Sequence, residues 1–243
     1  GAEMKVTILA PAYNEEDAID PFIDAVMPHL EDDWEILVVD DGSTDSTPER
    51  LEALAAANPR LRVVTHEQNA GIGAALATGF AAIPDGIIVT MDADLSHPLD
   101  LLPDLVAGCE NADACYGSRF VPGGGMVGVP LWRSAISQIA NVILRAAYRS
   151  PTRDLTTGYR AYRADAVHDL DLVGGGFETQ LEITIRLIAA GKTITEVPLV
   201  LTTRVAGESK MRYFSLIPPY ALMALRLLGL RWIPSRRPQH GNV

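Results

Sequence analysis

Cysteine and long apolar runs are scarce in this sequence, and each shortage excludes a class of protein. The 243 residues include two cysteines, Cys109 and Cys115, which are too few for a disulfide framework and lack metal-ligand spacing. We therefore expect buried thiols in a reducing compartment. A helix that spans a bilayer needs roughly 20 apolar residues, whereas the apolar stretch of residues 213–225 ends after 13, at Arg226. This stretch is too short to span a membrane.

Positive charge is also in short supply. The chain has 20 Lys and Arg against 31 Asp and Glu, for a net charge of −11. This balance argues against nucleic acid as a partner, because phosphate backbones require a basic face. From residue 204 onward the balance reverses, with seven basic residues and one acid, Glu208. A basic end of this kind predicts contact with an anionic ligand or an anionic lipid surface. A tail that only keeps the chain soluble is the alternative.

Short apolar runs alternate with segments of helical periodicity through the first half of the chain. The predicted strands are residues 5–10, 34–39, 61–65, 86–91 and 112–116. This alternation predicts an α/β domain with a mostly parallel sheet flanked by helices, in which ligands bind at the carboxyl ends of the strands. We place this domain at residues 4–212. Residues 213–243 form a basic, apolar tail, expected to contribute amphipathic helices that lie along a membrane interface or, alternatively, pack on the domain. Because the N-terminal residues enter the first strand directly, we expect no secretory leader.

Two carboxylates follow the predicted strand at residues 86–91. Side chains alternate along a strand, so Asp92 and Asp94 face the same way. Two hard oxygen ligands on one side suit Mg²⁺ or Mn²⁺ that also holds a diphosphate. An isolated pair of this spacing is usually only a solvated turn, and its position at a strand end is what favours a metal site.

Polar residues also follow the first two predicted strands. Asp40 ends the second strand, where an acid accepts hydrogen bonds from a ribose or a base, although a helix-capping turn or a phospho-acceptor receiver domain has similar acids. Tyr13 after the first strand suits stacking on a base, and Asn14 predicts a helix cap. Gly71 and Gly73 lack the third glycine of the dinucleotide fingerprint and do not follow the first strand, which excludes a Rossmann dehydrogenase.

These motifs, in this order, resemble those of GT-A glycosyltransferases of family 2. The matching segments are residues 11–16, 38–45, 92–98, 117–120 and 154–160. More narrowly, residues 117–125, 154–160 and 204–211 are similar to dolichol-phosphate (polyprenol-phosphate) mannose synthases. The resemblance implies a GT-A, Rossmann-like fold and inverting transfer of a hexose, mannose from GDP-mannose first, to a polyprenyl or dolichyl phosphate. It also implies Mg²⁺ or Mn²⁺, and a peripheral position at the cytoplasmic face of a membrane, with a separate membrane-anchoring partner left open.

The resemblance also assigns roles to individual residues. The nucleotide-sugar donor is expected at Pro11, Tyr13, Glu15, Asp40, Asp92, Ala93, Arg204 and Lys210. The metal is expected at Asp92, Asp94 and Ser96, with Ser96 where the family often has glutamine. Asp94 and Arg119 are the expected catalytic residues, and Arg119 and Ser134 the expected acceptor-phosphate residues. Gln180 and Glu182 fall on family-like positions and are assigned to site architecture, while His97 is expected to shape the metal loop.

The charge of the acceptor indicates how the reaction runs. A phosphate monoester has a second pKa of about 6, so it is largely dianionic at neutral pH and attacks without a general base. The alternatives are another donor, UDP-glucose or UDP-GlcNAc, a hydroxyl acceptor that would need a carboxylate base, and a nucleotide-sugar binder without turnover.

Overall fold

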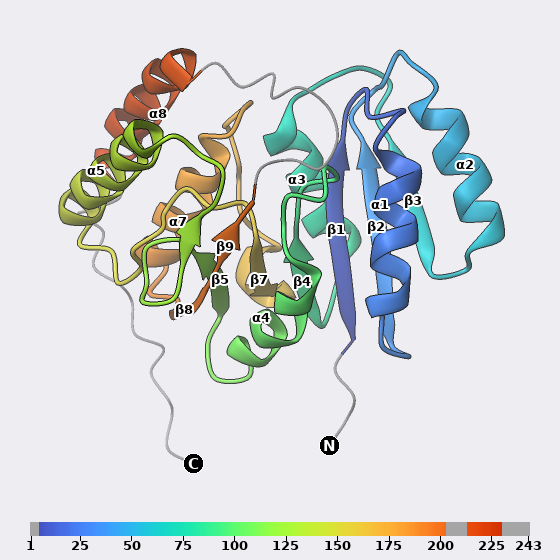
Figure 1. The fold of residues 1–243 in the computed structure, drawn as a ribbon, viewed down its shortest axis with the longest axis horizontal. Coiled ribbons are helices and arrows are strands. Elements are labelled where there is room, and N and C mark those ends of the chain that lie inside the picture. Colours follow the sequence, from blue (N-terminus) through green and yellow to red (C-terminus); the bar gives the residue numbers. More distant parts are fainter. Residues whose placement is uncertain (1–4, 203–212, 230–243) are drawn as a thin grey trace.

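The computed structural model describes residues 5–202 and 213–229, and in the second range it describes side chains from residue 218 onward. Its centre is a seven-stranded sheet in the order β3-β2-β1-β4-β7-β5-β8 (Figure 1). The strands are β1 (Val6–Ala12), β2 (Trp34–Asp40), β3 (Leu61–Thr65), β4 (Ile87–Thr90), β5 (Ala114–Ser118), β7 (Arg160–Arg163) and β8 (Ile194–Pro198). A separate pair joins β6 (Gly125–Met126) to β9 (Val200–Leu201). The predicted α/β fold with a mostly parallel sheet is confirmed, because β7 alone in the described sheet runs antiparallel to its neighbours.

Helices cover both faces of the sheet. They are α1 (Ile19–Val26), α2 (Thr47–Ala57), α3 (Ile72–Ala82), α4 (Leu102–Gly108), α5 (Leu131–Tyr148), α6 (Ala164–Val167), α7 (Thr179–Ala189) and α8 (Tyr213–Leu227), with single 3₁₀ turns at Met27–His29 and Leu99–Leu101. In the described ranges, the longest helix, α5, is not apolar enough to cross a bilayer, and neither is any other.

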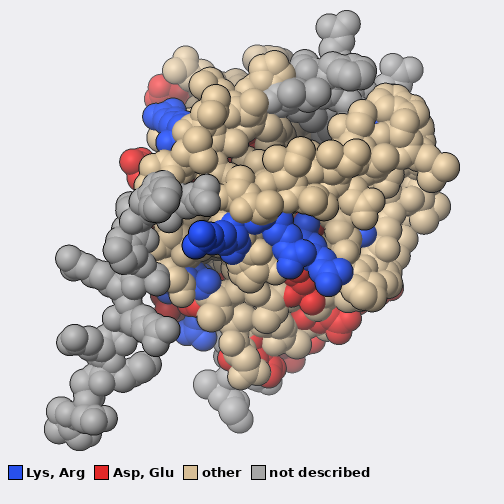
Figure 2. All heavy atoms as spheres, turned by 90° about the vertical axis from the view of Figure 1, so that its left-hand side faces the viewer, with Lys and Arg blue, Asp and Glu red and all other residues tan. Residues whose placement is uncertain are grey.

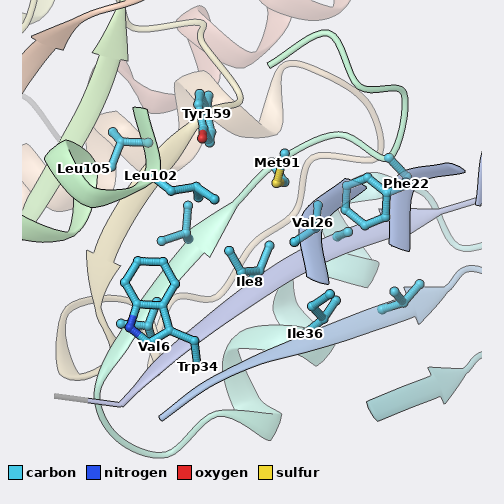
Figure 3. Close-up of a cluster of buried hydrophobic side chains, with 14 of the residues drawn as sticks. Val6, Ile8, Phe22, Val26, Trp34, Ile36, Met91, Leu102, Leu105 and Tyr159 are labelled. Atoms are coloured by element: carbon cyan, nitrogen blue, oxygen red, sulfur yellow. The ribbon is translucent and has the colours of Figure 1, made fainter. Parts of the chain in front are cut away.

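The two faces of the sheet carry separate cores, which explains why the central strands are almost continuously apolar. On one face, Val6 and Ile8 of β1 pack with Phe22 of α1 and Leu105 of α4 (Figure 3). On the other face, Leu9 of the same strand belongs to a cluster with side chains of α3 and α7. Successive β1 residues thus point to opposite sides, as the pleat requires.

A third apolar cluster lies outside the sheet and joins α5, α7 and α8. Tyr148 of α5, Leu181 of α7 and Met223 of α8 are buried in it. The Tyr148 hydroxyl also donates to the carbonyl oxygen of Ala224. Residues 218–229 of the predicted tail therefore contact the folded domain; the division of the chain at residue 212 remains a proposal.

Candidate active site

The polar segments that follow β1, β2 and β4 meet at one edge of the sheet. The parallel register pairs Ala12 with Asp40 and Leu9 with Thr90. The three strands therefore end side by side, as their parallel arrangement requires. Residues 13–16, 40–45 and 92–97 form this edge, and the structure brings the predicted nucleotide and metal residues of these segments together.

The Asp40 carboxylate is buried at this edge and retains one unused acceptor. Its Oδ1 accepts hydrogen bonds from the backbone N–H of Ser43, at 3.2 Å, and from the Ser43 hydroxyl, at 2.5 Å. Its Oδ2 has no hydrogen-bond partner in the described part of the chain. A buried, unsatisfied oxygen costs free energy unless a ligand supplies a donor. Asp40 therefore suits a base or ribose donor.

The β1–α1 loop is tied to the β2–α2 loop rather than being a simple helix start. Tyr13, which follows the register pair of Ala12 and Asp40, is 42% exposed, and Pro11 is half-buried at the end of β1. The backbone N–H of Glu15 donates to the Thr47 hydroxyl at 2.9 Å. The predicted cap at Asn14 is wrong: its φ is +53°, its Oδ1 accepts from the Thr44 N–H at 2.8 Å, and α1 begins five residues later. The exposed tyrosine ring is available for stacking at this edge.

The two predicted metal carboxylates occupy a tight turn after β4. Asp94 is buried, and its Oδ1 accepts from the backbone N–H of Ser96 at 3.0 Å. Asp92 is half-buried and Leu95, between the motif and Ser96, has a φ of +57°. Left-handed backbone at a leucine is a strained conformation of the kind that clusters at functional sites.

The ring of His97 contacts the same turn. Its Nδ1 accepts the backbone N–H of Asp92 at 3.3 Å, and its ring stacks on Tyr159 with centroids 4.7 Å apart. Burial lowers the pKa of His97, while the charges of Asp92 and Asp94 act in the opposite direction. The ring is thus neutral and accepts at Nδ1, which places its proton on Nε2. These contacts agree with the loop-shaping interpretation.

Gly158 lies between the carboxylate of Asp92 and the amide of Gln180. A Cβ added to Gly158 would lie 3.8 Å from both oxygens of Asp92 and 3.7 Å from Nε2 of Gln180. Gln180 is buried, and its Oε1 has no hydrogen-bond partner among the described residues. The carboxylates of Asp92 and Asp94 are hard oxygen donors of the kind that Mg²⁺ or Mn²⁺ prefers. In the described ranges no third His, Cys, Asp or Glu completes a metal-sized cluster, so a bound ion would take its remaining ligands from phosphate or water.

Arg119 follows β5 and is held by a carboxylate that we did not predict as a site residue. Its Nε and Nη2 donate to the two oxygens of Asp154 at 2.7 Å each, and Nη2 also donates to the Thr156 hydroxyl at 2.9 Å. Burial raises the pKa of Asp154, but the Arg119 charge and hydrogen bonds outweigh it and hold the pKa below its ordinary value. Because the same carboxylate accepts the N–H groups of Thr156 and Thr157, this segment forms a turn before β7. In the sequence, the polar stretch before Gly158 was the feature that could have indicated Asp154 as a site residue.

Arg119 also lines a pocket of about 390 Å³ with Ser134. The wall includes Gln138, from the same helix as Ser134, and a second guanidinium, Arg153. The structure thus brings together the two predicted acceptor-phosphate residues, which are 15 positions apart in the sequence. Two arginines at a pocket suit an anionic group.

One segment connects this pocket with the metal edge. Asp154 holds Arg119, and Gly158, four residues later, lies against Asp92. Four residues span at most about 14 Å. The buried guanidinium of Arg160 fixes the segment, donating to the carbonyl oxygens of Leu155 and Gln180 at 2.9 Å each.

Glu182 has a supporting position, and two other predicted residues are not among those that the structure describes. The buried Glu182 carboxylate accepts the N–H groups of Val173 and Gly174, and a Cβ on Gly73 would lie 1.7 Å from the Gly174 carbonyl oxygen. Glu182 thus anchors the glycine segment packed on the start of α3. The predicted diphosphate residues Arg204 and Lys210 lie outside the described residues.

Comparison with known proteins gives the family. Residues 7–171 match the family described as "Glycosyl transferase family 2". The undecaprenyl-phosphate mannosyltransferase of Micrococcus luteus is 37% identical over 214 residues, which cover 86% of this chain and 88% of that protein. The polyprenol monophosphomannose synthase of Mycolicibacterium smegmatis is 37% identical over 215 residues, covering 85% and 81%.

A solved structure matches the fold. Glucosyl-3-phosphoglycerate synthase from Mycobacterium tuberculosis, in complex with Mn²⁺, UDP and phosphoglyceric acid, superposes with a TM-score of 0.71 over 96% of this chain and 80% of that one, at 24% identity. That likeness establishes a GT-A-like sheet flanked by helices. Since the family pattern spans more than half of the chain and both relatives exceed one-third identity, the chain belongs to glycosyl transferase family 2 and is a glycosyltransferase.

Proposed function

We propose that this enzyme transfers a hexose, mannose from GDP-mannose in the first instance, to the phosphate of a polyprenyl or dolichyl lipid, with inversion. The observation that carries the proposal is the pocket containing Arg119 and Ser134, joined to the Asp92–Asp94 edge by one short segment. One relative is an undecaprenyl-phosphate mannosyltransferase and the other a polyprenol monophosphomannose synthase. They favour mannose over glucose or GlcNAc as the sugar and a polyprenyl phosphate over a hydroxyl as the acceptor.

The residues of the site divide the work between donor and acceptor. Asp40 accepts hydrogen bonds from the nucleoside and Tyr13 stacks on its base, and Asp92 and Asp94 would hold a divalent ion for the diphosphate. When bound, that ion offsets the negative charge of the leaving diphosphate. The structure of glucosyl-3-phosphoglycerate synthase, which has a similar fold, contains Mn²⁺ and UDP. For this chain, the assignment of an ion is based on the carboxylates of Asp92 and Asp94.

The acceptor side works by alignment of charges. Arg119 and Arg153 attract the lipid phosphate, and one of its oxygens attacks the anomeric carbon while the bond from that carbon to the diphosphate breaks. A dianionic phosphate carries no proton that must be removed, so no carboxylate base is required. Asp154 keeps the Arg119 guanidinium in place by two hydrogen bonds. A single displacement inverts the anomeric centre.

A donor and acceptor screen tests the proposal. Radiolabelled GDP-mannose, UDP-glucose and UDP-GlcNAc are offered with a short, water-soluble polyprenyl phosphate or with the corresponding polyprenol. We expect product from GDP-mannose and the phosphate, in the presence of Mg²⁺ or Mn²⁺. Product from the polyprenol would indicate the hydroxyl-acceptor alternative, and nucleotide-sugar binding without any product would indicate a binding protein.

Asp94→Asn tests the metal site within that screen. We expect turnover to fall at least about 100-fold, because the variant loses one charged ligand at the group that carries charge in the transition state. Asp100→Asn makes the same chemical change at an exposed position six residues later and should keep wild-type turnover. Equal turnover in Asp94→Asn and wild type would remove the metal assignment.

A further inference from the structure

Helix α5 exposes an apolar stripe from Leu131 to Ile143. Six of its large apolar side chains are between 41% and 88% exposed: Leu131, Trp132, Ile136, Ile139, Val142 and Ile143. Positions 132, 136, 139 and 143 repeat at the spacing of one helical face. A stable monomer rarely leaves a continuous apolar face of this kind in water, so such a face marks an interaction surface.

The charged residues of the segment that contains the stripe are all of one sign. From Val121 to Arg153 the sequence contains four arginines and no acidic residue, in a chain whose net charge is −11. At about 100° per residue, Arg133 and Arg145 lie about 120° from Ile139 on opposite sides of the helix. The stripe is therefore bordered by a guanidinium on each flank. Figure 2, which faces the α5 side of Figure 1, shows basic side chains gathered beneath a broad uncharged surface.

One flank of α5 lines the candidate acceptor pocket. Ser134 and Gln138, one turn apart, line the pocket with Arg119. By the same helical geometry they lie about 100–140° from Ile139, next to the stripe. A surface that received the stripe would thus meet the pocket wall along the same helix.

We propose that the outer face of α5, the stripe from Leu131 to Ile143 with its flanking arginines, docks on an anionic lipid surface and sets the acceptor pocket at the level of the lipid phosphates. The apolar side chains enter the boundary between headgroups and acyl chains, and Arg133 and Arg145 reach the anionic headgroups. The role of the pocket in this statement rests on the proposed function, whereas the docking itself does not.

Charge favours a lipid surface over a second copy of the chain. A symmetric dimer would bring the same face of two copies together. Each copy would then place its arginines against a surface without acids between residues 121 and 153. Anionic headgroups supply the missing negative charge. Helix α8, which packs against α5, adds the exposed Leu222 and Leu225 to this side of the molecule.

Vesicle flotation of the full chain tests the docking without donor or acceptor. We expect binding to vesicles of phosphatidylcholine with phosphatidylglycerol, weaker binding to phosphatidylcholine alone, and a decrease with added salt. Ile139→Glu/Ile143→Glu should weaken binding to the anionic vesicles at least about tenfold, because charged groups replace two inserted side chains. The matched control is Ala53→Glu/Ala57→Glu, which adds the same charges four residues apart on an exposed face of α2, and it should bind as the wild type does.

Turnover assays separate failure of the docking from failure of the proposed function. The Ile139→Glu/Ile143→Glu variant should match wild type on a water-soluble polyprenyl phosphate and lose turnover on a long-chain phosphate embedded in vesicles. Wild-type binding by this variant, or no vesicle binding by the wild type, would overturn the docking proposal. A wild-type dimer in sedimentation that the variant dissociates would assign the face to a second copy instead. Vesicle binding without turnover on any polyprenyl phosphate would remove the proposed function and leave the docking in place.

Discussion

Asp154 shows how one buried side chain sets the geometry of the site. It accepts three hydrogen bonds from Arg119, two of them from the guanidinium, and is fully buried, so its charge depends on that partner. Removing one charge of a buried pair leaves the other uncompensated, at a cost of about 3–5 kcal/mol. We expect Asp154→Asn to lower the free energy of unfolding by about this amount at pH 7, measured by urea titration.

The effect of Asp154 should depend on pH in a defined direction. Its pKa in the fold lies below the ordinary aspartate value of about 3.9. Above that value the carboxylate is ionised in both states, and the pair stabilises the fold fully. As the pH falls below it, the unfolded chain takes up the proton first, so the stabilisation disappears toward the lower pKa of the folded state. The difference between wild type and Asp154→Asn should therefore narrow below about pH 4.

A surface pair serves as the control for this prediction. Arg163 and Asp165 are 3.3 Å apart, and the Asp165 side chain is 67% exposed. Exposed pairs contribute less than about 1 kcal/mol, so Asp165→Asn should unfold almost as the wild type does. If Asp154→Asn also left the free energy of unfolding almost unchanged, Arg119 would not depend on its buried partner.

Single residues differ in how far the sequence could predict their roles. Asp40, Asp92 and Asp94 directly follow apolar strands, so their position at the sheet edge could be inferred from chain order alone. Asn14 and Asp154 could not be placed in this way, because their partners Thr44 and Arg119 lie 30 and 35 residues away. Their chemistry depends on contacts that no local pattern reports.

At the scale of elements, α5 is joined to Arg119 through Asn141. The buried Asn141 accepts the Leu155 N–H at 2.8 Å and donates to the Thr156 hydroxyl at 3.2 Å, and that hydroxyl also accepts from Arg119. We expect Asn141→Leu to leave the Leu155 N–H unsatisfied and to destabilise the fold by about 1–3 kcal/mol. Since Arg119 then loses support, KM for the polyprenyl phosphate should rise more than KM for the donor.

Asn58→Leu is the control for the loss of the side-chain hydrogen bond to the helix backbone. Asn58 donates to the carbonyl oxygen four residues earlier, at 2.9 Å, and Asn141 makes the same type of bond to Ser137 at 3.0 Å. The Asn58 variant should lose stability without a change in either KM. If Asn141→Leu also left the acceptor KM unchanged, α5 would not position Arg119.

The elements themselves were predicted where a local period identifies them. Apolar runs predicted the first five strands of the sheet, because a strand buried on both faces is a short apolar segment. The place of β7 between β4 and β5, antiparallel to both, was not predictable. Strand order is decided by contacts between distant segments, and no period in the sequence carries it.

At the scale of the whole molecule, the question is whether the C-terminal segment belongs to the folded unit. Met223 and Leu227 of α8 are buried against α5 and α7, while Leu222 and Leu225 of the same helix are exposed. Packing of this kind couples the helix to the domain, whereas a tail that only lies on a membrane would be independent of it. Substituting the buried pair and the exposed pair separately distinguishes a packed helix from an independent tail in the intact chain.

Met223→Ala/Leu227→Ala should therefore lower the melting temperature of the full chain in the absence of lipid. Truncating two buried apolar side chains costs about 4 kcal/mol or more, which is about 10 °C for a protein of this size. Leu222→Ala/Leu225→Ala removes two side chains from the solvent-facing side of α8, and should leave the melting temperature nearly unchanged. If both double variants had the melting temperature of the wild type, residues 213–243 would behave as a separate interfacial tail. Helix α5 alone would then connect the lipid surface to the pocket.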